Sequence, residues 1–308
     1  MSRLVTDFSG IVERTTRAVA AGRKPRAGLI LPSDLSALNT VCRAASLNLV
    51  EPVLIGDEPL ARKNLARLDE PPGHIEILDF REPDMAMQAA VGMAASGQLD
   101  LLVSGRVSQR DLLRTLLDRR YGFVSREILS HVAVMKPALY DRLFFLTDAA
   151  VNIEPDLECK LRIIENAVEV ARIIGVDRPR VALIAAVDMV YTQMPVTTDA
   201  AVIAKMAERG QIENAWVDGP FSFDVAVDDL AARAKGIKDS PVAGRADIVI
   251  APGLETANGV YRAMSLYGEA DIGGVIFGGA VPVVMNLRTE PDQSRLNSII
   301  LGTLIAAS

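Results

Sequence analysis

The segment from residue 104 to residue 114 carries the clearest pattern for binding an anion. A short apolar run ends in Ser104 and Gly105, and a helix is expected to begin near Ser108. Glycine allows a close backbone approach, and the N–H groups and dipole at a helix start favour negative charge. Three arginines, whose planar fork of donors suits phosphate, follow at four-residue spacing: Arg106, Arg110 and Arg114. The segment predicts phosphate binding; the alternative is a helix capped by Ser108 and Asp111 with solvated arginines.

Three further segments place polar residues or glycine near the ends of expected strands. Asp148 ends a very apolar run, where it is either a ligand group or a helix cap. Asn258 and Gly259 are poor helix formers near the start of an expected helix, which indicates a close approach or a polar contact. Arg288 stands between a strand and the last helix, either as a binding group or as a surface arginine. Asp292, near the start of that helix, favours the helix dipole and needs no function to explain it.

Alternating apolar runs and helix-length segments indicate how these residues are positioned. Buried strands are expected at residues 27–32, 51–57, 74–80 and 99–105, with helical patterns between them, such as 34–47 and 83–96. That alternation predicts βα units and an α/β fold with mostly parallel sheets. Ligands of such sheets bind beyond the carboxyl ends of the strands, where the polar residues above are found.

The middle of the chain continues this pattern with one difference. Residues 128–134 and 142–148 are two expected strands joined by a turn-rich loop, so we expect that pair to be antiparallel. A long helix is expected from 156 to 174 because its apolar residues recur at 3.6-residue spacing. Further strands are expected at 180–186, 214–219, 246–252, 271–279 and 282–286, and a last helix from near residue 291.

Composition excludes several classes of function. The chain has 308 residues, of which 50% are hydrophobic and 23% charged, as suits a globular protein. A net charge of −6 argues against nucleic acid as a partner. Two distant cysteines and two histidines (Cys42, Cys159, His74 and His131) give no metal-type spacing, so no metal is expected. Without a signal peptide or a long apolar run, the chain is expected to be cytoplasmic with no membrane partner.

The familiar nucleotide and hydrolase motifs are missing from the sequence. There is no G-x-x-x-x-G-K-[ST] loop, no G-x-G-x-x-G after the first strand and no G-x-S-x-G elbow. Anion recognition at strand ends is therefore the chemistry that remains.

The segments together resemble the phosphate acetyltransferase and phosphate butyryltransferase family, in the same order over most of the chain. The resemblance runs from LVSGRVSQRDLLRTLLDRRYG through LFFLTDAAVNIEPDLECKLRIIENAV and ADIVIAPGLETANGVYRAM to GGAVPVVMNLRTEPDQSRLNSI. Residues 200–206 and 210–218 are more similar to the butyryl branch. The resemblance implies conversion of acyl-CoA and phosphate to acyl phosphate and CoA, by direct attack in a ternary complex. It also implies that CoA is a substrate, that no metal or organic cofactor is used, and that the chain forms a homodimer or larger homo-oligomer.

The same resemblance implies two α/β domains with mostly parallel sheets and an active site in the cleft between them. This architecture is similar to that of the isocitrate and isopropylmalate dehydrogenases. The first domain is expected over residues 1–138 and 280–308, and the second over 139–279.

Site residues carry over only where the family's motifs match this sequence. The phosphate side is expected to be lined by Ser104, Gly105, Ser108 and Arg114. The family's strand-end fingerprint is matched by Asn258, Gly259 and Tyr261, which join Asp148 as expected substrate-binding residues. Arg288 matches the arginine of a C-terminal motif and is expected to bind phosphate or the acyl oxygen during catalysis.

Two positions depart from the acetyl branch, which has a Ser directly before that arginine and an Asp six residues after it. Here these positions are Leu287 and Ser294, and Asp292 or Glu290 would have to replace the Asp as base. The departure leaves open a catalytically degenerate acyl-CoA-binding or regulatory protein on the same fold. A dehydrogenase of related architecture is a third alternative, but the Asp cluster and nicotinamide site that it needs are not found.

Overall fold

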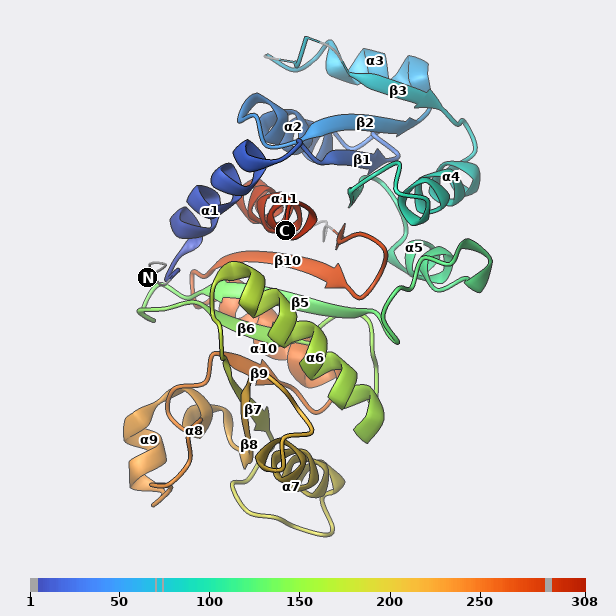
Figure 1. Ribbon diagram of the computed structural model, residues 1–308. Helices are drawn as coiled ribbons and strands as arrows, with labels where there is room; N and C mark the ends of the chain where they lie inside the picture. The colour runs from blue at the N-terminus through green and yellow to red at the C-terminus, as the bar shows by residue number, and fades with distance from the viewer. Residues whose placement is uncertain (1–4, 70, 74, 286–289) are drawn as a thin grey trace. The chain divides into compact units, whose positions relative to one another are not determined.

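The computed structural model describes residues 5–69, 71–73, 75–285 and 290–308 (Figure 1). The chain forms two compact units, which are described separately. The terminal unit comprises Phe8–Leu129 and Ile272–Ser308. The middle unit comprises Ser130–Asp271 together with the described residues up to Asp7.

The terminal unit is built on strands in the order β3-β2-β1-β4-β11-β10. Their bounds are β1 Arg26–Ile30, β2 Glu51–Gly56, β3 Glu76–Asp79, β4 Leu101–Ser104, β10 Asp271–Phe277 and β11 Val283–Val284. The pairs from β3 to β11 are parallel, and β10 runs antiparallel to β11. The parallel strands β1, β2 and β4 are almost continuously buried, as expected for strands covered on both faces.

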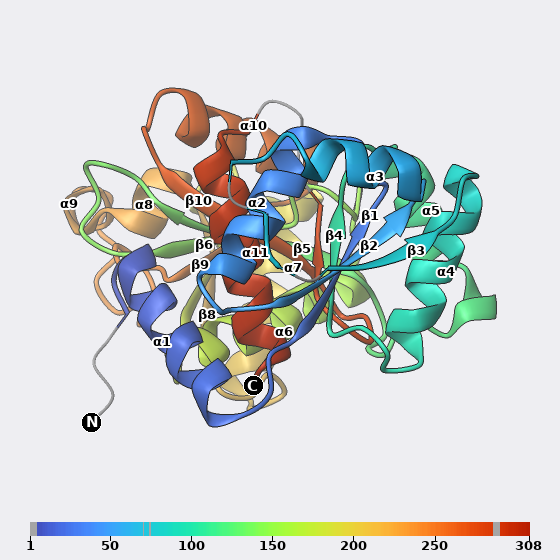
Figure 2. The ribbon, with the colours of Figure 1, turned by 90° about the horizontal axis from the view of Figure 1, so that it is seen from above.

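The helices of the terminal unit alternate with its strands along much of the chain. They are α1 Phe8–Ala21, α2 Leu35–Ser46, α3 Glu58–Leu65, α4 Pro83–Ala95, α5 Gln109–Leu116 and α11 Asp292–Ala306, with a short 3₁₀ turn, η1, at Arg119–Tyr121. Helix α11 lies against α1 and α2 (Figure 2) and also contacts β4 and β11. Every residue from Ser294 to Leu304 is buried, so α11 is a core helix of this unit.

The middle unit has strands in the order β5-β6-β9-β7-β8. Their bounds are β5 Ser130–Lys136, β6 Phe144–Thr147, β7 Arg180–Ile184, β8 Trp216–Phe221 and β9 Ile248–Ile250. The helices are α6 Leu157–Ile174, α7 Pro195–Glu208, α8 Phe223–Val227, α9 Asp229–Ala234 and α10 Leu254–Leu266. Strands β5 and β6 are antiparallel, and the other pairs are parallel.

These elements confirm the predicted α/β fold with mostly parallel strands, and the one predicted antiparallel pair. The predicted long helix is α6, which begins after Asp156, whose side chain accepts from the N–H of Cys159 at 2.8 Å. Helix α1 was not predicted. It buries Phe8, Ile11 and Val19 along one face, which is the 3.6-residue period of an amphipathic helix.

Candidate functional site

The predicted phosphate segment lies at the carboxyl end of β4 in the terminal unit. Ser104 is the last, buried residue of that strand, and the N–H of Gly105 donates to the Ile30 carbonyl at 2.8 Å. The N–H of Arg106 donates to the Leu31 carbonyl at 3.1 Å. A β-carbon at position 105 would lie 2.3 Å from the Leu31 oxygen and 2.5 Å from the Ile30 oxygen. Only glycine fits there, so the loop before α5 is fixed tightly against the end of β1.

Helix α5 has the cap that the sequence suggested. Ser108 is its N-cap and accepts from the N–H of Asp111 at 3.4 Å. Because the helix begins at Gln109, Arg110 and Arg114 are helical, whereas Arg106 lies in the loop before them. All three arginines are exposed. Ser108 therefore caps α5, and this capping role does not exclude a ligand at the start of the helix.

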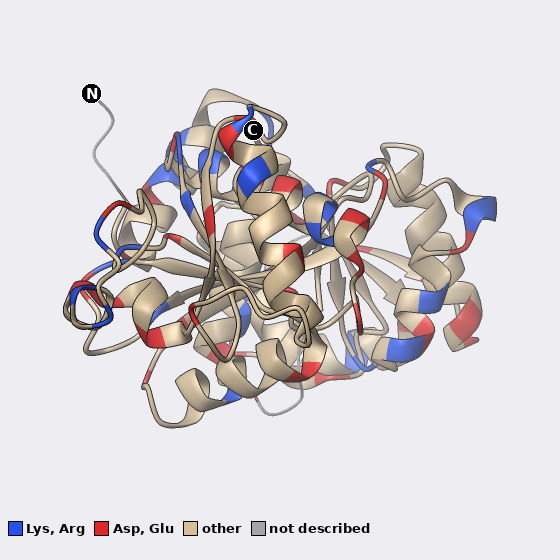
Figure 3. Ribbon diagram, turned by 90° about the horizontal axis from the view of Figure 1, so that it is seen from below, with Lys and Arg blue, Asp and Glu red and all other residues tan. Residues whose placement is uncertain are grey.

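The charges of the three arginines are compensated to different degrees. Arg114 lies 3.3 Å from the Asp111 carboxylate, as an exposed i,i+3 pair. Within the described ranges, Arg106 and Arg110 have no ion-pair partner. On the ribbon as a whole, Lys and Arg are interspersed with Asp and Glu (Figure 3). The end of β4 thus presents positive charge that is free to bind an anion.

The start of α11 brings Asp292 against α2. The Ser36 hydroxyl donates to the Asp292 carboxylate, and the guanidinium of Arg295 donates to Ser36 Oγ at 2.7 Å. Arg295 is 4% exposed and also lies 3.7 Å from Asp34, the N-cap residue of α2. Asp292 is thus held in a charged network that the sequence analysis did not find, although Arg295 is the one charged residue inside an apolar helix.

Two residues of the predicted C-terminal motif, Leu287 and Arg288, lie outside the described residues. Ser294, at the position where the acetyl branch has Asp, is buried within α11. Its carbonyl accepts from the hydroxyl of Ser298 at 2.8 Å. Position 294 therefore carries no carboxylate, and its residue is packed inside the helix.

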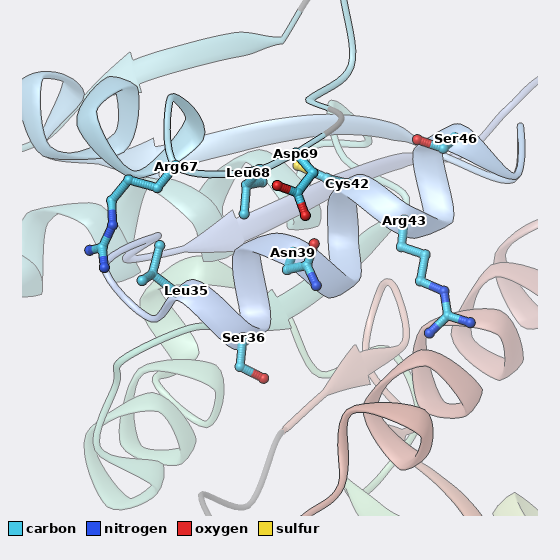
Figure 4. Close-up of a pocket in the computed structure, with 9 residues that line it drawn as sticks. All are labelled: Leu35, Ser36, Asn39, Cys42, Arg43, Ser46, Arg67, Leu68 and Asp69. Carbon is cyan, nitrogen blue, oxygen red and sulfur yellow. The ribbon is translucent and has the colours of Figure 1, made fainter.

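A hollow of about 680 Å³ lies beside α2 (Figure 4). It is lined by Leu35, Ser36, Asn39, Cys42, Arg43, Ser46, Arg67, Leu68 and Asp69. Burial raises the pKa of the Cys42 thiol to about 11, so that thiol is protonated and unreactive at neutral pH. The hollow shares only Ser36 with the network around Asp292.

In the middle unit, Asp148 follows β6 and is buried. One carboxylate oxygen accepts from the N–H groups of Ala150 and Val151, both at 3.0 Å. The other accepts from the Asn152 N–H at 3.2 Å and from its side-chain amide at 2.6 Å. Asp148 therefore shapes the loop after β6, and α6 begins only at Leu157.

Helix α10 joins the same loop. The side-chain amide of Asn258 donates to the Ala149 carbonyl at 3.3 Å, and the N–H of Leu254 donates to Ile153 at 2.9 Å. Tyr261 is buried, whereas Gly259 is exposed with no atom within 4 Å of an added β-carbon. The structure therefore brings Asp148, Asn258 and Tyr261 together, and packing alone does not require glycine at position 259.

His131 belongs to this cluster but was not predicted as a site residue. Its ring meets the Tyr261 ring edge-on, with centroids 6.1 Å apart and planes at 69°. The Nδ1 atom of His131 and the Oγ1 atom of Thr147 are buried without a hydrogen-bond partner among the described residues. Burial lowers the pKa of the His131 imidazole, and the Asp148 carboxylate opposes that effect in part. His131 is thus held as a neutral imidazole near neutral pH.

The predicted residues are thus divided between the two units. Ser104, Gly105, Ser108, Arg114 and Asp292 lie in the terminal unit, and Asp148, Asn258, Gly259 and Tyr261 lie in the middle unit. Across the described ranges, His, Cys, Asp and Glu side chains form no group of three suited to a metal ion. No helix among those ranges has the length and apolar character needed to cross a membrane.

Comparison with known proteins finds relatives that carry phosphate acyltransferase names. The phosphate acetyl/butaryl transferase family matches residues 81–303. A phosphate butyryltransferase of Clostridium beijerinckii is 37% identical over 282 residues, covering 92% of this chain and 93% of that protein. The crystal structure of a branched-chain phosphotransacylase from Enterococcus faecalis V583 superposes with a TM-score of 0.79 at 27% identity, covering 92% of this chain and 99% of that one.

A more distant likeness concerns the fold alone. A 4-hydroxythreonine-4-phosphate dehydrogenase from Burkholderia phymatum superposes with a TM-score of 0.55 at 15% identity, over 92% of this chain and 99% of that one. This confirms the predicted relation to a dehydrogenase architecture. A shared fold does not carry an activity with it, so the likeness gives no support to a dehydrogenase function.

Proposed function

Because the chain belongs to the phosphate acetyl/butaryl transferase family, we propose that it catalyses the reversible reaction of acyl-CoA and phosphate to acyl phosphate and CoA. The observation that carries the proposal is the family match over residues 81–303, which includes the strand-end segments described above. CoA is a substrate in this reaction, and no metal or organic cofactor takes part in it.

The end of β4 supplies what a phosphate site requires. Gly105 allows the loop before α5 to lie directly against the end of β1. The first turn of α5 offers N–H groups and the positive end of the helix dipole. Arg106 and Arg110 add two exposed positive charges. We assign inorganic phosphate, or the phosphoryl group of the acyl phosphate, to this site, together with Ser104, Ser108 and Arg114.

The reaction is a direct acyl transfer. In the direction of CoA acylation, the CoA sulfur adds to the carbonyl carbon of the acyl phosphate, and phosphate leaves with the electron pair of the broken C–O bond. Negative charge develops on the carbonyl oxygen and on the phosphate, where fixed donors stabilise it. One such donor contributes about 2.7–4 kcal/mol at the barrier. Arg288 is the residue that we assign to this role, and binding both substrates together adds a proximity effect.

The acyl group that we propose is short, of the butyryl type. Its support is the name of the Clostridium relative and the branched-chain title of the Enterococcus structure. One methylene changes selectivity by only about 1–3 kcal/mol, so related chains are expected to react at graded rates. We place the reaction in the cytoplasm, carried out by a homodimer or larger homo-oligomer.

A second candidate function is acyl-CoA binding without turnover. The buried Ser294 supports it, because no carboxylate is available at that position to take the thiol proton. The two functions differ in one observable, which is whether CoA is released from acyl-CoA when phosphate is added.

A thiol-release assay tests the proposal. Acetyl-, propionyl-, butyryl- and longer acyl-CoA are each offered with and without phosphate, and free CoA is measured colorimetrically. We expect release that requires phosphate and is fastest with a short chain, and we expect Arg288→Ala to abolish it. Arg233→Ala is the matched control, since Arg233 is exposed and pairs with Asp229 on its own helix. Tight CoA binding without release from any donor would establish the second function instead.

A further inference from the structure

His131 lies at the same strand end as three residues of the candidate site. Strand β5 pairs with β6 in an antiparallel register in which Ala133 faces Leu146. His131 stands two residues before Ala133 and Asp148 two residues after Leu146, just beyond these paired residues, and the Asp148 carboxylate acts on the pKa of the His131 ring. The edge-on contact with Tyr261 brings α10 against the imidazole.

The hydrogen bonds around Asp148 determine what the imidazole can do. Both oxygens of Asp148 accept from donors of residues 150–152, so the carboxylate is committed to its own loop. The buried Nδ1 of His131 has no partner among the described residues. The residue is partly exposed while its Nδ1 is buried, so Nε2 is the ring nitrogen that remains to exchange a proton with a bound molecule.

The charged groups on neighbouring elements leave the imidazole neutral. The Asp148 carboxylate favours the charged form of the His131 ring, but burial outweighs it, so the pKa is lowered. On α6, Lys160 is paired with Asp199 at 2.6 Å, and the Cys159 thiol has a raised pKa because it is partly buried. On α10, Arg262 lies over the Tyr261 ring, 5.9 Å from its centroid. A neutral imidazole that is partly open to solvent is the form that accepts a proton.

Acyl transfer to CoA is accelerated by such an acceptor. A free thiol has a pKa of about 8.5, so only a small fraction is thiolate at neutral pH. We propose that His131 is the general base that removes the thiol proton of CoA, an inference that rests on the proposed function. As the S–H bond breaks, the proton passes to Nε2 and the sulfur forms a bond to the acyl carbon. The C–O bond to phosphate breaks and phosphate leaves with the electron pair. In the reverse direction, the imidazolium returns the proton to the departing sulfur.

The test is the pH dependence of kcat/KM for CoA with acyl phosphate, in the wild type and in His131→Gln. The wild-type rate is expected to level off above the pKa of the imidazole. In the variant the thiolate must form in solution, so the rate should climb with pH until about 8.5. We expect a loss of about 10²–10⁴-fold at pH 7 that shrinks steadily toward pH 9. The other histidine of the chain supplies the control His74→Gln, which should retain the wild-type profile.

The outcomes separate this inference from the proposed function. A wild type without phosphate-dependent CoA release from any acyl-CoA would remove the proposed function itself. The role of His131 would be overturned if the wild type is active and His131→Gln has the same pH profile of kcat/KM, with values within threefold of the wild type. If His131→Gln and His131→Asn both fail to fold, NMR titration of the wild-type imidazoles decides. A His131 pKa equal to the kinetic pKa supports the role, and a clear difference between the two overturns it.

Discussion

Gly105 and Leu31 approach each other so closely that the missing β-carbon of Gly105 determines the shape of the β4–α5 loop. That β-carbon would lie 2.3 Å from the Leu31 carbonyl oxygen, well inside van der Waals contact. Leu31 itself has a positive φ of 53°, which is uncommon for a residue other than glycine. The ends of β1 and β4 are therefore locked together directly beneath the proposed phosphate site.

Replacing Gly105 by alanine should destabilise the protein and disable phosphate binding together. Because backbone atoms rather than flexible side chains fill the space, we expect a loss of about 1–3 kcal/mol in the free energy of unfolding, measured in urea. Gly92→Ala is the matched control. Gly92 lies inside α4 with no atom within 4 Å of an added β-carbon, so it should stabilise by about 0.4–1 kcal/mol. A neutral effect of Gly105→Ala would show that the loop can move away from β1.

Removing the two arginines without an ion-pair partner should weaken the binding of anionic substrates. In Arg106→Ala/Arg110→Ala we expect KM for phosphate to rise about tenfold, with a smaller rise at high salt because exposed charges are screened. Initial rates at two ionic strengths measure this. Arg120→Ala is the control, since Arg120 is exposed and already paired with Asp118 at 2.6 Å. An unchanged KM in the double variant would place phosphate elsewhere.

Asp148→Asn should destabilise the loop after β6. The carboxylate accepts from three backbone N–H groups and one amide, and an asparagine presents only one accepting oxygen to them. Hydrogen bonds to charged groups contribute about 1.5–3 kcal/mol, so a loss of that order is expected in urea unfolding. Asp228→Asn gives the comparison, because Asp228 caps the exposed helix α9 through one bond to the Leu230 N–H. Its cost should be smaller, about 0.5 kcal/mol or less.

Asp247 should make stability depend on pH in the opposite direction from most carboxylates. Burial raises its pKa, although the N–H and guanidinium of Arg180 act the other way. A raised pKa in the folded state favours the protonated form, so its contribution is complete at low pH and is lost as pH rises through the folded pKa. Asp247→Asn should therefore gain melting temperature relative to wild type at pH 7 but not at pH 4.

Asp118 provides the contrast for that experiment. Hydrogen bonds from Arg120 lower its pKa, so its contribution exists above the unfolded pKa and disappears as pH falls. Asp118→Asn should therefore lose a little melting temperature at pH 7 and none at low pH. If the melting temperatures of both variants, relative to wild type, change with pH in the same direction, burial does not determine the pKa of Asp247.

The alternation of apolar runs was sufficient to predict most strands and their parallel arrangement, because each buried strand appears in the sequence as a short run of hydrophobic residues. The strand-end rule also led to Ser104, Gly105, Asp148 and Asn258. It could not find His131 or Arg295. Both lie inside apolar segments, where periodicity indicates only the core, and their partners come from residues far away in the chain. Helix α1 was missed because its apolar face is interrupted by polar residues such as Thr15, which bonds within the helix and is buried against α11.

The late position of helix α11 in the chain determines the order in which the two units can fold during translation. Strands β1 to β4 are synthesised early, yet α11, which packs against α1, α2 and β4, is translated only after the whole middle unit. Helices α2 and α4 already contact β1 and β2, but the surfaces of α1, α2 and β4 that α11 buries stay exposed until then. The middle unit has all its own strands and can fold first. Chaperones that shield exposed hydrophobic segments are needed most during this interval. A stop codon before residue 292 would leave those surfaces of α1, α2 and β4 permanently exposed.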